Sequence, residues 1–171
     1  MLTATMDGMD NTMKIKIRKG LFETNSSSIH ALCIPTNEEH VLPKKVIFRT
    51  GEYGWGPDEE YNTGNYLYTM LLDLKLDDRI QQLKEILEEH GIETIFKEPS
   101  PDDYYYVDHA GCFDEDFLGD IFSDEDKLLR YLFCPSSHII LFNDNSDCTE
   151  AREELSKIEN SKDWEIYEKW N

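Results

Sequence analysis

The 171-residue sequence lacks several features that define common classes of protein. Its four cysteines form no CxxC pair, which argues against a zinc knuckle and a dithiol redox motif. No apolar run approaches the roughly 20 residues that a transmembrane helix needs. The N-terminus lacks the basic, apolar and small-residue regions of a signal peptide. We therefore expect a cytoplasmic protein with reduced thiols and no membrane association.

Positive charge is also scarce. The chain has 17 Lys and Arg against 36 Asp and Glu, a net charge of −19. Up to Gly51 there are seven basic and five acidic residues, so ten basic residues stand against thirty-one acidic ones from Glu52 onward. Eleven carboxylates and no Lys or Arg lie between Glu98 and Asp126. Such a region disfavours direct binding to a phosphate backbone and favours a basic protein surface, a metal ion, or no partner.

The remaining composition is typical of one globular domain. Apolar residues make up 39% of the chain and aromatic residues 12%, enough for a packed core. We expect residues 1–12 to form a disordered extension and residues 13–171 to form a single α+β domain. Its sheet should be mainly antiparallel and accompanied by four or so short helices.

Alternating and buried apolar patterns predict the strands at 14–18, 29–34, 46–49, 93–97, 104–108, 139–142 and 164–167. The fourth and fifth of these flank Pro99-Ser100-Pro101, which predicts a hairpin.

Helical spacing and capping residues predict the helices. Asn62 or Thr63 should cap the first, and Asp77 or Asp78 a second that ends at Gly91. A short helix is expected at 115–122, another after a Ser123 cap, and a last one at 149–158.

The densest group of reactive side chains lies at 23–30, in the segment Glu-Thr-Asn-Ser-Ser-Ser-Ile-His. Ser26, Ser28 and His30 would supply a nucleophile and a base if their side chains converge. If Ser28 and His30 lie on one strand they face the same side of it, but no residue is identifiable that would orient the imidazole. The alternative, which base rates favour, is a turn whose side chains bond their own backbone, with His30 half-buried.

A second group, Asp108, His109, Asp114 and Asp116, offers carboxylates and an imidazole to a divalent cation. Its order does not match an EF-hand loop or an HExxH helix. The favoured alternative is a solvated acidic loop in which Asp114 caps the next helix.

The glycine-rich stretch 51–56 lacks the lysine of a P-loop and the spacing of a dinucleotide fingerprint. Tyr53 and Trp55 between its glycines would form an interface anchor or a stacking platform if exposed. Folding back over the edge of the core is an equally supported alternative.

Four segments carry a resemblance. Residues 18–30, containing Phe-Glu-Thr-Asn-Ser-Ser-Ser-Ile-His, the Gly-Glu-Tyr-Gly-Trp loop at 51–55, and the stretches 128–137 and 143–146 resemble largely uncharacterised small proteins of Gram-positive phages and mobile elements. The resemblance implies no specific reaction. It implies only a genomic context, that of the small accessory proteins of phages. Such proteins often disable a host restriction or CRISPR nuclease.

Two functions follow as hypotheses. In the first, which we favour, the protein is an anti-CRISPR or anti-restriction inhibitor in the host cytosol. It needs no cofactor and occupies the basic nucleic-acid groove of a host nuclease by imitating phosphates. The binding residues would be Asp102, Asp103, Asp114, Glu115, Asp116, Asp120, Tyr53 and Trp55.

In the second, the chain is a small hydrolase, transferase or nuclease that uses Ser26, Ser28 and His30 with a carboxylate or a divalent cation. Lys16, Arg18 and Lys19 would then meet a phosphate-bearing substrate. A third possibility is that the negative charge only keeps the protein soluble.

Overall fold

The computed structural model describes residues 28–54, 62–108, 110–143 and 149–169. The strands are β1 (Ser28–Pro35), β2 (Lys45–Phe48), β3 (Glu52–Tyr53), β4 (Glu93–Phe96), β5 (Tyr106–Val107), β6 (His138–Asn143) and β7 (Trp164–Lys169). The helices are α1 (Thr63–Asp73), α2 (Asp77–Glu89), the 3-10 turn η1 (Ala110–Phe113), the π-helical turn η2 (Asp114–Leu118), α3 (Gly119–Ser123), α4 (Glu125–Phe133) and α5 (Thr149–Glu159). The predicted α+β class is confirmed.

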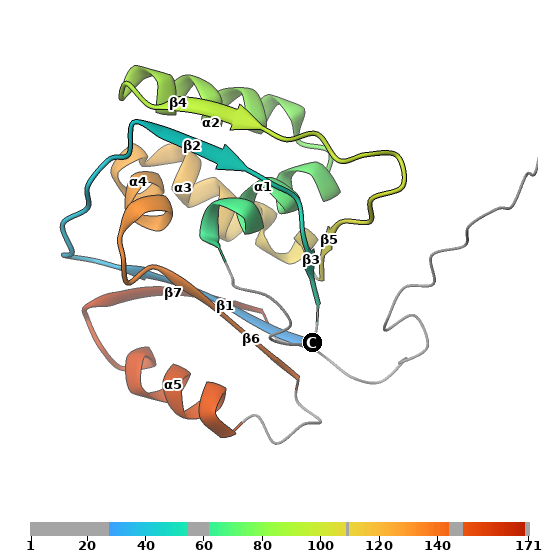
Figure 1. The fold of residues 1–171 in the computed structure, drawn as a ribbon. Helices are drawn as coiled ribbons and strands as arrows, with labels where there is room; N and C mark the ends of the chain where they lie inside the picture. The colour runs from blue at the N-terminus through green and yellow to red at the C-terminus, as the bar shows by residue number, and fades with distance from the viewer. Residues whose placement is uncertain (1–27, 55–61, 109, 144–148, 170–171) are drawn as a thin grey trace, which may run out of the picture.

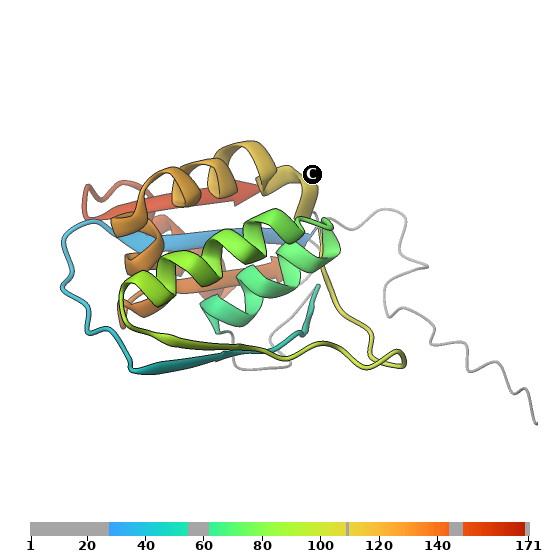
Figure 2. The same ribbon diagram turned by 90° about the horizontal axis from the view of Figure 1, so that it is seen from above.

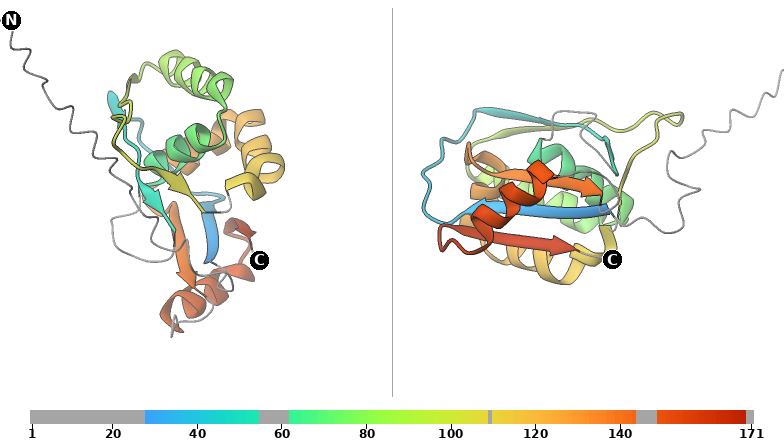
Figure 3. Two further views of the ribbon diagram at one scale, coloured as in Figure 1. Left: turned by 90° about the vertical axis from the view of Figure 1, so that its right-hand side faces the viewer. Right: turned by 90° about the horizontal axis from the view of Figure 1, so that it is seen from below.

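The main sheet has three antiparallel strands in the order β6-β1-β7. Every residue of the central strand, β1, is buried. Helix α5 covers one face of the sheet, and α1, α3 and α4 lie on the other (Figures 1 and 3).

The alternation of β1 divides its side chains between two cores. Leu32 and Ile34 point into the larger core, where they join aromatic residues such as Tyr66 and Phe117. Ile29, Ala31 and Cys33 point the other way, into a smaller core beneath Leu155 of α5.

Two pairs of short parallel strands extend the fold. β2 pairs with β4, and β3 pairs with β5. The predicted hairpin at 93–108 is therefore wrong, because β4 and β5 each pair with an earlier strand and not with each other. Helices α1 and α2 form the crossover that parallel pairing requires. The rings of Phe48 and Phe96 stack across β2 and β4, with centroids 4.8 Å apart.

The ends of the helices follow the predicted signals in part. The side chain of Asn62 caps α1 by accepting from Asn65 N–H, and Gly91 ends α2 with φ +74°. The predicted Ser123 cap is wrong: Asp124 caps α4 by accepting from Lys127 N–H. Helix α2 begins without a side-chain cap, and Asp77 lies in its first turn, where a carboxylate favours the helix dipole.

The predicted extension at 1–12 and the predicted strand at 14–18 lie outside the described residues. Within the described ranges, no helix combines the length and apolar character needed to span a bilayer.

Candidate functional site

Two of the three predicted catalytic residues lie on β1 and are fully buried. Ser28 and His30 are 0% and 1% exposed, and both point toward the larger helical side of the sheet. Ser26 lies outside the described residues. The prediction that Ser28 and His30 share one face of a strand is confirmed, because Leu32 and Ile34 continue that face into the larger core.

His30 joins three parts of the fold. Its Nε2 lies 3.1 Å from the carbonyl oxygen of Gly54, and its Nδ1 lies 2.8 Å from the hydroxyl of Tyr66 on α1. Because a carbonyl oxygen only accepts, Nε2 carries a proton and donates it to Gly54. In the neutral ring, Nδ1 then accepts from the Tyr66 hydroxyl. The imidazole thereby links β1 to α1 and to the loop after β3.

The partners of His30 are fixed in turn. Burial raises the pKa of Tyr66 well above its usual value, with smaller contributions from neighbouring groups including Asp108, so its hydroxyl remains a donor. A side chain at Gly54 would meet the hydroxyl at the end of the Tyr106 side chain, so a larger residue here would require that ring to move. The junction therefore depends on close approach of the backbone as well as on side chains.

Ser28 has a different partner. Its hydroxyl donates to Oδ2 of Asp108 across 2.6 Å, joining residues 80 positions apart in the chain. Asp108 directly follows β5, and its backbone N–H donates to the carbonyl of Tyr53 at 2.8 Å. A hydroxyl that donates to a carboxylate forms one of the stronger protein hydrogen bonds.

Ser28, His30 and Tyr66, which are buried, and Asp108, which is half-buried, thus form one polar cluster, which we call the polar junction. A serine nucleophile activated by histidine would donate its proton to the imidazole. Here Ser28 donates to Asp108, and His30 Nε2 donates to Gly54. The observed hydrogen bonds form a structural link between the sheet, α1 and the end of β5. This link contains a hydroxyl, an imidazole and a carboxylate.

Tyr53 is a core residue. It is 4% exposed, and its ring meets that of Tyr66 edge-on with centroids 5.0 Å apart. For Tyr53, the structure therefore bears out the alternative of packing against the core, and this ring is no exposed anchor. Trp55 lies outside the described residues.

The predicted metal-binding residues lie in different environments and do not form one site. Asp108 accepts from Ser28, whereas Asp114 and Asp116 are exposed on η2. His109 lies outside the described residues. In the described part of the chain, no three His, Cys, Asp or Glu side chains are arranged to hold a metal ion.

The predicted acidic binding residues fall in two places. Asp102 and Asp103 lie in the connection between β4 and β5, whereas Asp114, Glu115, Asp116 and Asp120 lie on η2 and α3. These two segments are on opposite sides of α1 and α2 (Figure 2). The carboxylates are therefore not all available to one flat partner surface.

The larger group continues into α4, and we call it the acidic ridge. All seven of its residues are exposed: Asp114, Glu115, Asp116, Asp120, Asp124, Glu125 and Asp126. The two cations of segment 114–130, Lys127 and Arg130, lie beneath it, with side chains only 16% and 11% exposed.

Each of these cations is shared between carboxylates. Lys127 Nζ lies 2.7 Å from Glu165 and 3.7 Å from Asp120. Arg130 Nε donates to Asp126 at 2.9 Å, and its Nη1 lies 3.8 Å from Glu165. Seven carboxylates on the ridge and Glu165 beside them stand against two cations, which leaves a net charge of −6. The outer side of this segment is therefore negative.

Sequence reasoning missed Tyr66 and the carbonyl of Gly54, although they hold both ring nitrogens of His30. A usable signal existed for Tyr66: it lies on the apolar face of a predicted helix, and a buried tyrosine hydroxyl needs a hydrogen-bond partner. The Gly54 carbonyl carries no sequence signal.

Comparison with known proteins gives no relative. No protein-family model, curated protein or solved structure matches the chain. Function is therefore inferred from the polar junction and the acidic ridge themselves.

Proposed function

We propose that the protein is an inhibitor that binds a basic partner protein through the acidic ridge. The observation that carries the proposal is the arrangement of charge along η2, α3 and α4. Exposed carboxylates lie on the outside, and the nearby cations, half-buried Lys127 and buried Arg130, lie beneath them. Such a surface produces a negative potential that attracts Lys and Arg on a partner.

A nucleic-acid groove is the basic surface that suits this ridge best. Proteins that hold nucleic acid line the groove with Lys and Arg, because neutralising phosphates supplies much of the affinity. A folded ridge of carboxylates competes for the same cations. Together with the resemblance of segment 18–30 to phage and mobile-element proteins, this supports a host CRISPR or restriction nuclease as the partner.

The test is inhibition of a purified host nuclease by wild-type protein and by two triple variants. The first variant, Asp114→Asn, Glu115→Gln and Asp116→Asn, removes three charges from the ridge. The matched control, Glu150→Gln, Glu153→Gln and Glu159→Gln, removes three charges from exposed positions of α5 on the opposite face of the sheet (Figure 3). We expect the ridge variant to inhibit about tenfold less well and the α5 variant to inhibit normally.

Salt provides a second readout. The Debye screening length shortens from about 10 Å at 0.1 M to about 3 Å at 1 M ionic strength. Inhibition through the ridge should therefore weaken steeply over that range. Equal losses in the two triple variants would show that only total charge matters, and inhibition insensitive to salt would rule out the ridge. Melting temperatures of both variants show whether either change affects folding.

A second candidate function is a small hydrolase, transferase or nuclease acting at the polar junction. The observation that favours it is the short contact of 2.6 Å between Ser28 and Asp108, beside a buried imidazole. In this case Ser28→Ala and Asp108→Asn should abolish the effect of the protein on the host nuclease, and the ridge variant should retain that effect. Comparison of the ridge variant, the α5 variant, Ser28→Ala and Asp108→Asn in the host nuclease assay therefore separates the two functions.

A further inference from the structure

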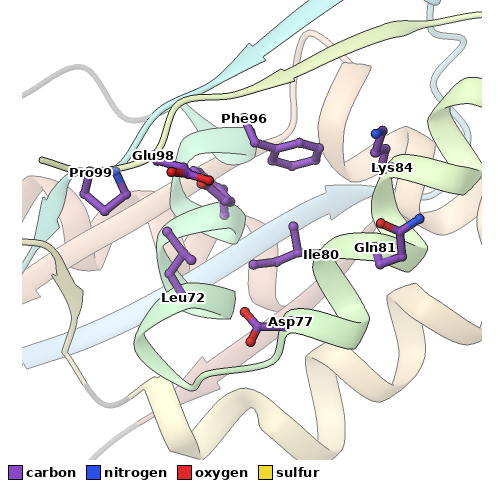
Figure 4. A pocket seen from close by; sticks show the side chains of 9 residues that line it. Leu72, Asp77, Ile80, Gln81, Lys84, Phe96, Glu98 and Pro99 are labelled. Atoms are coloured by element: carbon purple, nitrogen blue, oxygen red, sulfur yellow. The ribbon is translucent and has the colours of Figure 1, made fainter.

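A groove separate from the polar junction and the acidic ridge opens between α1, α2 and the chain that follows β4. Its volume is about 440 Å³, within the range of sites that bind small ligands. Glu98 and Pro99 lie toward one end and Gln81 and Lys84 toward the other (Figure 4). The groove therefore has polar ends and an apolar middle.

Rigid apolar side chains form the middle of the groove. Leu72 from α1 and Ile80 from α2 lie between the polar ends, with Phe96 beside them (Figure 4). The ring of Phe96 is held by its stack on Phe48 and by Tyr68, whose ring centroid is 5.2 Å away. This surface is formed before any ligand arrives and suits an aliphatic chain.

The charges around the groove are unbalanced. The side chains of Asp77 and Glu98 both line it, and neither carboxylate forms an ion pair or hydrogen bond with any residue that the structure describes. Lys84, the cation in the lining, lies 3.8 Å from Glu88 on the same helix. Two carboxylates that pair with no described cation, beside an apolar surface, suit a ligand that combines an aliphatic stem with a positive charge.

Helix α2 separates this groove from the acidic ridge. Arg79 and Gln82 face α3, where Arg79 lies over the ring of Phe122 and Gln82 donates to its carbonyl. Ile80, Gln81 and Lys84 face the groove. A partner on the ridge therefore needs to reach across one helix, a width of about 10–12 Å, to place a side chain in the groove.

We propose that the groove binds an arginine side chain of the partner protein. The inference rests on the proposed function, since it takes the arginine from the basic protein that binds the ridge. The aliphatic stem packs on Leu72 and Ile80, and the guanidinium pairs with Glu98 and Asp77. Arginine suits the site better than lysine because its planar, weakly hydrated head stacks on aromatic rings and pairs with carboxylates in a fixed geometry.

The experiment is a titration of the full-length, 15N-labelled protein, followed by NMR, with four small probes. These are the Nα-acetyl amides of arginine, lysine, citrulline and norleucine. Citrulline keeps the shape of arginine without its charge, and norleucine keeps only the stem. We expect the arginine probe to bind with a dissociation constant of roughly millimolar size and to shift the amide signals of Leu72, Ile80 and Glu98.

Two variants locate the binding. Glu98→Gln and Asp77→Asn should each weaken binding of the arginine probe about tenfold or more, because each removes one charge-assisted partner. Glu89→Gln is the matched control on the exposed side of α2, and it should bind normally. Spectra of the free variants test whether each remains folded.

Three results would overturn the assignment. Equal binding of norleucine would show an apolar site, equal binding of citrulline would show that the positive charge is not recognised, and equal binding of lysine would remove the preference for arginine. Signals of the groove that do not move would show that it binds none of these side chains. The titration contains no partner protein, and the ridge variant leaves the groove intact, so this inference and the proposed function fail in separate experiments.

Discussion

Replacing His30 with alanine tests whether the polar junction is structural. The change leaves the Tyr66 hydroxyl without an acceptor and the Gly54 carbonyl without a donor, in a site that is 1% exposed. Each unsatisfied group costs about 1–3 kcal/mol. A cavity of roughly 70 Å³ costs about 1.7 kcal/mol more. Allowing for relaxation and entry of water, we expect His30→Ala to lower the free energy of unfolding by about 3–5 kcal/mol.

For a domain of this size, that loss lowers the melting temperature by about 6–20 °C. Urea denaturation of wild type, His30→Ala, Tyr66→Phe and the double variant measures the effect directly. Tyr66→Phe should cost about 1–2 kcal/mol. The double variant should lose about 1 kcal/mol less than the sum of the single losses, because both changes break the same hydrogen bond.

His90→Ala is the matched control. His90 is exposed, and its contact with Glu125 at 3.4 Å lies at the surface, so its removal should cost no more than about 0.5 kcal/mol. If His30→Ala unfolds as wild type does while the protein loses its function, the structural interpretation of the junction is refuted and catalysis by His30 is favoured.

Two further predictions concern thiols and alkaline pH. Cys112 is exposed, whereas burial, aided by the charges of Glu154 and Glu168, raises the pKa of Cys33 to about 12. Alkylation mapped by mass spectrometry at pH 8 should therefore modify Cys112 in the native protein and Cys33 only on unfolding, and equal rates would contradict the packing of α5. Burial and a hydrogen bond to Asp120 raise the pKa of Tyr167 to about 12 from the usual 10.0, so its folded form keeps a proton that the unfolded chain releases. The contribution of Tyr167 to stability should be complete below pH 10 and disappear as pH rises toward 12. Urea denaturation of wild type and Tyr167→Phe across this range measures that contribution. Identical pH profiles for the two proteins would contradict the prediction.

Local patterns predicted the individual elements well. The alternation of Ser28, His30, Leu32 and Ile34 defines one face of β1 because adjacent strand residues point to opposite sides. The end of α2 at Gly91 was predictable because glycine adopts a positive φ at low cost. Both features depend on residues close together in the sequence.

Pairing over long distances was not predictable from the same patterns. The turn residues at 99–101 favour a hairpin, yet β4 pairs with β2 and β5 pairs with β3. The choice of partner strand depends on how the crossover formed by α1 and α2 packs. No local sequence pattern indicates that packing. The contact of Ser28 with Asp108 has the same origin, since pairing of β3 with β5 brings Asp108 to β1.

The acidic ridge was only partly visible in the sequence. The density of carboxylates between Glu98 and Asp126 was evident, but their separation by α1 and α2 was not. The position of Lys127 and Arg130 beneath the ridge was equally hidden, because their partner Glu165 comes from β7. The groove at Glu98 gave no pattern at all, since its lining comes from two helices, the end of β4 and an irregular stretch.

The position of β1 also governs how a newly made chain can fold. Cys33 pairs with His138, 105 residues later, and Pro35 pairs with Trp164. At a synthesis rate of about 5–20 residues per second, roughly 5–20 s pass between the appearance of β1 and that of β6. During this time the apolar central strand has no neighbouring strand, whereas α1, α2 and the parallel pairs around them are already available. A chain interrupted before β6 would leave β1 exposed and prone to aggregate, so ribosomal pausing between β5 and β6 should lower the yield of soluble protein.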